Sequence, residues 1–331
     1  MIEVQNLSKA FGPKLAVNDV SFSVRRGEVL GFLGPNGAGK STTMRMLTGF
    51  IPPSDGKISV GGFDMLTNPI PAKRLIGYLP ENAPVSVDMS VRSFLSFCAE
   101  LGGLRGKARK NAINRVVEMC FLETVINQSV DTLSKGYRHR TCFAQAIIHD
   151  PDVLVLDEPT DGLDPNQKHE IRGLIRRMGE HKAIIFSTHI LEEVEAACSR
   201  AIVIDRGQIV ANGTPSELKQ KSEFGGAILV AVRGVEGIQF VEKLSHIPNA
   251  RKATLVKEEN GEVWARVFPT DGRTVDHNGD LVRNVLEAAN GWKVEALRTE
   301  EGRLDEVFRS ITLPETVKSH GNDASVTHAH Q

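Results

Sequence analysis

The first two thirds of the chain alternate extended apolar runs with stretches of helical spacing. The extended runs are residues 2–7, 15–24, 28–34, 152–158, 183–189 and a hairpin over 201–213 around Arg206-Gly207. The helical stretches are residues 41–49, 90–122 with a Gly-rich break, and 166–179. Several of the extended runs, such as "EVLGFLG" and "DVLVLDE", are continuously apolar, which is typical of strands buried on both faces of a parallel sheet. The alternation predicts an α/β core with a mostly parallel sheet.

After about residue 220 the pattern restarts with a different order. It predicts a strand, a helix, a hairpin around Asn260-Gly261, a helix, a strand and a short helix: residues 227–234, 235–247, 252–268, 280–291, 293–300 and 304–311. The β-α-β-β-α-β order indicates a ferredoxin-like split arrangement. We therefore expect an N-terminal domain over residues 1–220, an α+β domain over 221–312 and a tail over 313–331.

The tail is polar and rich in Ser, Thr and His, a composition that favours a disordered end. Its histidines at 320, 328 and 330 leave metal binding open as an alternative. The four cysteines are scattered without metal-like spacing, which indicates reduced thiols in a cytosolic protein. No signal-peptide core opens the chain, and no apolar run approaches the roughly 20 residues that span a bilayer. Any membrane role is therefore expected to come through a partner.

Composition adds few constraints. The chain has 331 residues, of which 40% are hydrophobic and 24% charged, as in ordinary globular proteins. Its formal net charge of -1 argues against nucleic-acid binding through a global positive field.

The stretch "GPNGAGKST" matches the phosphate-binding pattern G-x-x-x-x-G-K-[ST] in full, between a buried strand and a helix. The predicted ATP-binding residues are Gly34, Pro35, Asn36, Gly37, Ala38, Gly39, Lys40, Ser41 and Thr42. Glycines let successive backbone N–H groups approach phosphate oxygens, and the helix N-terminus adds positive charge. Lys40 is expected to reach the β- and γ-phosphates, and Ser41 to hold Mg²⁺. A chance match would lack this strand–loop–helix setting.

Two acids end the apolar run "VLVLDE". Asp157 would be costly to bury alone, and a Mg²⁺ partner removes that cost. Glu158 is the natural carboxylate to orient and deprotonate water, with a solvated strand-end charge as the alternative. No Asn-Lys-x-Asp-type base reader follows a strand, so the sequence favours ATP over GTP.

The stretch "LSKGYRHR" predicts a helix that begins at Ser134. The Ser134 hydroxyl, the Gly136 N–H and the helix dipole together form a candidate second anion site. An ordinary Ser N-cap is the alternative. If two copies pack head to tail, each one can close the ATP site of the other.

These motifs together resemble the nucleotide-binding subunit of an ABC transporter, over residues 1 to about 220. "GPNGAGKST" corresponds to Walker A, "VLVLDE" to Walker B, "LSKGY" to the signature and "DGLDP" to the D-loop. The resemblance implies an ATPase with a RecA-like core, an antiparallel β-subdomain and a helical subdomain. It also implies that His189 senses the γ-phosphate, that Phe11 stacks on adenine, and that Asp164 acts across a dimer with Ser134, Lys135 and Gly136.

Two departures from the family pattern affect the site. The signature carries Lys135 and Tyr137 where glycine and glutamine are usual, and Lys135 either attracts phosphate or is solvated. The Q-loop-like "IGYLPEN" carries Glu81 in place of glutamine, so Glu81 joins Ser41 and Asp157 as an expected Mg²⁺ residue. Glu at this position and "LDEVFRSIT" near the end resemble the branch of gliding-motility and drug-efflux ATPases with separate export-type permeases.

The implied function is an ATP-hydrolysing motor, a homodimer that works from the cytoplasmic face of the cell membrane through a permease. The family docks its permease on the helical segment, here residues about 82 to 130, where the basic "LRGKARK" favours a solvated surface over a lipid contact. One alternative is a soluble ABC-type ATPase of translation or DNA repair, which usually has two motif sets or coiled-coil insertions. Another makes the C-terminal domain a ligand-sensing or dimerising module. The sequence does not name the cargo.

Overall fold

The computed structural model describes residues 1–81, 88–270 and 278–312, so the tail histidines lie outside the described residues. The chain divides into two compact units, Met1–Pro215 and Ser216–Gln331. Among the described helices, none combines the length and apolar character needed to cross a bilayer.

The first unit is built on a six-stranded sheet with the order β10-β9-β3-β8-β7-β6. Its strands are β3 (Glu28–Leu33), β6 (Ile76–Leu79), β7 (Val153–Asp157), β8 (Ala183–Thr188), β9 (Arg200–Asp205) and β10 (Gln208–Gly213). All neighbours pair in parallel except β9 and β10, which form the expected hairpin. This confirms the predicted α/β core with a mostly parallel sheet.

The continuous apolar runs are explained by burial on both faces of this sheet. In β7, Leu154 and Leu156 pack into one hydrophobic core, while Val153 and Val155 pack into the other. Side chains alternate between the faces of a strand, so a strand covered on both sides needs apolar residues at every position. Asp157 ends β7 at the edge where the parallel strands β3 and β8 also end.

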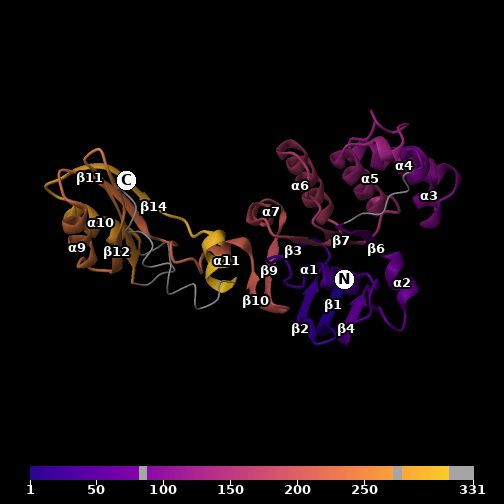
Figure 1. Ribbon diagram of the computed structural model, residues 1–331, viewed down its shortest axis with the longest axis horizontal. Coiled ribbons are helices and arrows are strands. Elements are labelled where there is room, and N and C mark those ends of the chain that lie inside the picture. The colour runs from indigo at the N-terminus through magenta and orange to yellow at the C-terminus, as the bar shows by residue number, and fades with distance from the viewer. Residues whose placement is uncertain (82–87, 271–277, 313–331) are drawn as a thin grey trace. The chain divides into compact units, whose positions relative to one another are not determined.

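Two further layers complete the first unit. A four-stranded antiparallel sheet has the order β2-β1-β4-β5 and consists of β1 (Ile2–Phe11), β2 (Lys14–Val24), β4 (Asp55–Val60) and β5 (Phe63–Asp64). The helices are α1 (Lys40–Leu47), α2 (Pro69–Arg74), α3 (Val91–Leu101), α4 (Gly106–Met119), the 3₁₀ turn η1 (Val130–Thr132), α5 (Lys135–Ile147), α6 (Pro165–Gly179) and α7 (Leu191–Ala197). In Figure 1, α3, α4 and α5 cluster apart from β1, β2 and β4, with the parallel sheet between them.

Three short elements of this unit are not predicted by the hydrophobic pattern. β6 has 4 residues, α2 has 6 and α7 has 7, so each is too short to display a clear period. Pairing with β7 determines β6, and packing against α6 and β3 supports α7. Tertiary contacts thus define these elements more than local propensity does.

Helix α8 (Pro215–Lys219) begins at the last residue of the first unit. The second unit then contains β11 (Ile228–Arg233), α9 (Gly237–Ser245), β12 (Ala250–Glu259), β13 (Glu262–Pro269), α10 (Asn278–Ala288), β14 (Lys293–Thr299) and α11 (Leu304–Thr312). Its strands form an antiparallel sheet with the order β12-β13-β11-β14. Val230, Phe240 and Val285 belong to a hydrophobic core of its own. The ferredoxin-like assignment and the expected domain boundaries stay predictions.

Candidate functional site

The loop between β3 and α1 has a backbone that only glycine accommodates at two points. A Cβ at Gly34 would lie 2.5 Å from the carbonyl oxygen of Ile204. Gly39 has a φ of +108° and precedes the first helical residue, and a Cβ there would lie 2.6 Å from the carbonyl oxygen of Ala16. The loop therefore packs closely on its neighbours while its amides stay near the start of α1, where negative charge is favoured.

Lys40 lies inside this loop with a side chain only 6% exposed. Its Nζ donates to the carbonyl oxygens of Gly34 at 2.8 Å and Pro35 at 3.2 Å, and lies 3.7 Å from Glu158 Oε1. Burial lowers the pKa of Lys40, and the neighbouring Glu158 opposes that shift. An anion entering the loop would gain a desolvated cation already held in place.

An open cavity of about 370 Å³ gathers many of the expected ligands. Its lining consists of Phe11, Lys14, Ala16, Asn36, Gly37, Gly39, Lys40, Ser41, Thr42, Glu81 and Glu158. Phe11 ends β1 and is 51% exposed, with Lys9 Nζ 5.3 Å from the centroid of its ring. The exposed part of the ring can stack on a planar base. Gly34, Pro35 and Ala38 shape the loop without lining this cavity.

Asp157 is almost fully buried yet only half satisfied. Ser41 Oγ donates to Asp157 Oδ1 at 3.1 Å, and Ser187 Oγ donates to the same oxygen. Asp157 Oδ2 is buried without a hydrogen-bond partner among the described residues. An orphaned carboxylate oxygen beside a serine hydroxyl is the hard-oxygen donor set that suits Mg²⁺. Glu81 lines the same cavity, but no described hydrogen bond joins it to this pair.

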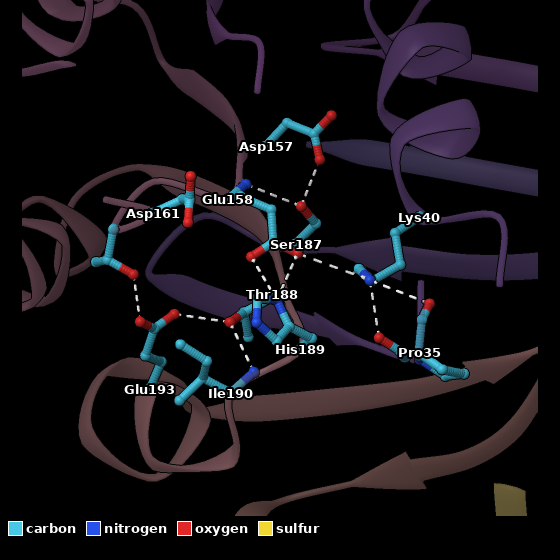
Figure 2. A network of polar contacts seen from close by, with 12 residues as sticks. Pro35, Lys40, Asp157, Glu158, Asp161, Ser187, Thr188, His189, Ile190 and Glu193 are labelled. Atoms are coloured by element: carbon cyan, nitrogen blue, oxygen red, sulfur yellow. Dashed lines mark hydrogen bonds and ion pairs between the residues drawn. The ribbon is translucent and has the colours of Figure 1, made fainter. Parts of the chain in front are cut away.

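Glu158 and His189 meet at the carboxyl ends of β7 and β8, as Figure 2 shows. His189 Nδ1 lies 3.2 Å from Glu158 Oε1 and 3.1 Å from Oε2. The Glu158 backbone has a positive φ of 50°, and its N–H donates to Ser187 Oγ at 3.0 Å. Burial raises the pKa of Glu158, while His189 and then Lys40 act to lower it. A carboxylate with a raised pKa beside an imidazole is chemically suited to accepting a proton.

The residues expected to act in trans lie outside the lining of this cavity. Ser134 caps α5 and accepts the Tyr137 N–H at 3.4 Å, so the ordinary N-cap role is present. Gly136 packs against the Gln167 side chain, and Asp164 caps α6. Lys135 lies over Gly162 and forms an exposed ion pair of 3.0 Å with Asp161 of the D-loop.

Four polar residues that build this site are not among those predicted from the sequence. Ser187 links Asp157 to the Glu158 backbone, while Thr160, Thr188 and Glu193 form a second network beside His189. A usable signal exists for two of them. Ser187 and Thr188 are polar residues that end a buried apolar strand, as Asp157 does, and such residues need partners.

Comparison with known proteins gives consistent matches. The family model for ABC transporter matches residues 17–161. The linearmycin resistance ATP-binding protein LnrL of Bacillus subtilis (strain 168) is 30% identical over 318 residues, covering 94% of this chain and 98% of the relative. The Nod factor export ATP-binding protein I of Burkholderia orbicola (strain AU 1054) is 40% identical over 228 residues, covering 68% of this chain and 74% of the relative.

A solved structure of an ATP binding subunit of an ABC transporter aligns with a TM-score of 0.62 and 28% identity, covering 67% of this chain and 92% of that one. The predicted P-loop fold is thereby confirmed. With a full-length relative at 30% identity, the chain belongs to the family of ABC transporter ATP-binding proteins and is an ATPase of that family.

Proposed function

We propose that this chain is the motor subunit of an exporter, in which two copies close around two ATP molecules and drive a separate membrane permease. We assign ATP binding to the cavity beside α1. The relatives are named for linearmycin resistance and Nod factor export, which supports export as the direction.

The observation that carries the dimer proposal is that one copy supplies only part of an ATP site. Phe11, Lys40 and Glu158 line the cavity, whereas Ser134 and Gly136 are not among its lining residues. At the α5 N-terminus the Ser134 side chain accepts the Tyr137 N–H, and the remaining first-turn amides with the helix dipole are suited to a phosphate group. A second copy that presents this helix start to the cavity would complete the binding site.

Asp157 and Ser41 are the residues we assign to Mg²⁺, because Asp157 Oδ2 is buried and unpartnered and Ser41 Oγ lies 3.1 Å from Oδ1. Glu81 is the third residue of this proposed set and shares the cavity. When bound, the ion supplies neutralisation of phosphate charge. Asp157 and Glu158 bring two carboxylates to the site, with Glu81 a third, so the cation also lowers the repulsion that a triphosphate meets.

For the hydrolytic step we assign proton acceptance from water to Glu158. Its raised pKa favours taking a proton, and His189 in contact with both carboxylate oxygens keeps the group oriented. Lys40 stabilises the negative charge of the transferred phosphoryl group from within the loop. His189 is about half exposed and is therefore accessible to the γ-phosphate.

We also assign Lys135 a role other than phosphate attraction or plain solvation, the two alternatives that the sequence leaves open. Its ion pair with Asp161 joins the signature to the D-loop of the same chain, which also carries Asp164. A movement of Ser134 on binding phosphate would thus also move the segment that follows Glu158, because Lys135 holds Asp161. We also propose that residues 221–312 form an accessory domain and that the permease holds the subunit at the cytoplasmic membrane face.

Replacing Glu158 by glutamine tests the catalytic assignment. Glu158→Gln keeps the side-chain shape and removes the proton acceptor, so ATP binding should persist while turnover falls by about 100- to 10,000-fold. Steady-state phosphate release and equilibrium ATP binding measure the two effects separately. Glu192→Gln, which changes an exposed glutamate of α7, is the control and should retain turnover. A Glu158→Gln rate close to wild type would remove Glu158 from the base role.

Isolation of the chain from membranes tests the transport assignment. An integral membrane protein recovered in constant ratio with the chain supports the motor role. Recovery with ribosomes or DNA in place of a membrane protein would favour the soluble ABC-type alternative.

A further inference from the structure

A buried carboxylate near the site has no role in the mechanism above. Glu193 lies in α7 and is 1% exposed. It accepts a hydrogen bond from Thr188 Oγ1 at 2.7 Å and another from Thr160 Oγ1. The nearest cation is Lys168, whose Nζ lies 3.9 Å from Glu193 Oε1. Burying a charge in this way is costly, so the two hydroxyl partners must offset much of its desolvation.

The two threonines lie on the segments that carry the catalytic pair. Thr188 ends β8 and directly precedes His189, and its Oγ1 also accepts the N–H of Ile190 at 3.0 Å. Thr160 follows Glu158 by two residues, where the chain turns towards the D-loop. One side chain of α7 therefore joins the backbone on both sides of the contact between Glu158 and His189, as Figure 2 shows for Glu193 and Thr188.

From this arrangement we propose that Glu193 is a positioning residue that holds His189 against Glu158 by bridging Thr160 and Thr188. The inference rests on the roles proposed above for Glu158 and His189. The backbone of Glu158 adopts a positive φ of 50°, which costs free energy unless surrounding contacts hold it. Ser187 fixes the residue from its N-terminal side, and the bridge fixes the segment that follows.

A carboxylate suits this bridge because it accepts two hydrogen bonds and donates none. Both threonine hydroxyls can then donate to it, which leaves the oxygen of Thr188 free to accept the Ile190 N–H. Glutamine has the same length. Its carbonyl oxygen can still accept from one threonine hydroxyl, while its NH₂ group must donate to the other, so both residues remain bridged but one hydrogen bond is reversed. Alanine removes both branches.

Steady-state ATPase kinetics of the full chain test the proposal. Glu193→Ala should lower kcat by about 10- to 100-fold with KM for ATP changed less than about twofold, because positioning acts on the reacting groups. Glu193→Gln should recover most of kcat. Glu192→Ala, which removes the neighbouring exposed carboxylate of α7, should match the wild type.

The split between kcat and KM, measured together with the thermal unfolding midpoint of each variant, separates positioning from mere stabilisation. In folded Glu193→Ala, loss of the contact between His189 and Glu158 should lower kcat while KM for ATP stays nearly unchanged, whereas a merely destabilised protein would lose activity only in proportion to its unfolded fraction. The charged groups around Glu158, Lys40 and Asp157, are unchanged in this variant. If Glu193→Ala fails to fold, Thr160→Val removes one branch with little change of shape, and should lower kcat by about 3- to 10-fold with KM for ATP nearly unchanged.

A kcat within twofold of wild type in the folded variant, or a loss that Glu193→Gln does not recover, would overturn the proposal. The activity of Glu158→Gln, measured alongside, distinguishes failure of the catalytic assignment from failure of the bridge through Glu193. If Glu158→Gln is active, the catalytic assignment itself fails. If it is inactive while Glu193→Ala and Thr160→Val behave as wild type, only the bridge fails.

Discussion

Ser187 joins three parts of the site, so its removal has consequences that can be worked out from single atoms. Its Oγ accepts the Glu158 N–H at 3.0 Å and donates to Asp157 Oδ1. Ser187 itself is fully buried in β8. Ser187→Ala removes both hydrogen bonds and adds no bulk, so any change arises from the lost polar contacts.

The expected loss of stability is about 3 kcal/mol. A neutral hydrogen bond to a backbone amide contributes about 1 kcal/mol, and one to a charged group about 1.5–3 kcal/mol. Asp157 keeps Ser41 Oγ as a donor at 3.1 Å, so its carboxylate is not left bare. The lower half of the second range therefore applies, and the two contributions add to roughly 3 kcal/mol.

Urea unfolding followed by far-UV circular dichroism measures the change. The fluorescence of Trp264 and Trp292 serves as an internal reference, because both tryptophans of the chain lie in the second unit. Ser23→Ala, at an exposed position of β2, is the matched control and should change the free energy of unfolding by less than about 0.5 kcal/mol. A loss below about 1 kcal/mol in Ser187→Ala would refute the view that this hydroxyl satisfies buried groups.

Other substitutions have distinct expected outcomes. Because burial raises the folded-state pKa of Glu158, its stabilising contribution is full below the unfolded pKa of about 4.3 and is lost as pH rises through the folded pKa. The stability of Glu158→Gln relative to wild type should therefore rise on going from acidic to neutral pH. A difference between the unfolding midpoints of variant and wild type that is the same at acidic and neutral pH would contradict this. Gly39→Ala should abolish ATP binding, because its Cβ would lie 2.6 Å from a backbone oxygen and distort the loop. The Cβ of Gly37→Ala meets no atom within 4 Å, so this variant should lose only about 1–2 kcal/mol of stability through its positive φ. Lys135→Gly should cost less than about 1 kcal/mol, since both partners of the pair with Asp161 are exposed, and a larger loss in thermal unfolding would contradict that.

Features that depend only on residues close together in the sequence can be predicted from the sequence. The position of the loop from Gly34 to Thr42 between a buried strand and a helix follows from nine consecutive residues, and the structure has it between β3 and the start of α1. The ATP-binding roles of these residues stay predictions. The parallel core follows from the apolar runs of β3, β7 and β8 for the same reason. The roles of Phe11 and His189 came from family resemblance, and they stay predictions until tested.

Interactions between distant segments are the part that sequence does not reveal. Thr160 and Glu193 are 33 positions apart, and Lys135 and Asp161 are 26 apart. Nothing in a hydrophobic period says which buried hydroxyl faces which carboxylate, because that depends on how α7 packs beside β8. Lys135 illustrates the point, since sequence offered phosphate attraction or solvation and the structure pairs it with the D-loop.

The central claim, that two copies share each ATP, is tested most directly by sedimentation velocity of Glu158→Gln with Mg²⁺-ATP. We expect a dimer that forms only with ATP and that dissociates when Ser134→Asp is added, since aspartate retains the helix cap but repels phosphate. A chain that stays monomeric at saturating ATP, or a dimer indifferent to Ser134→Asp, would contradict it.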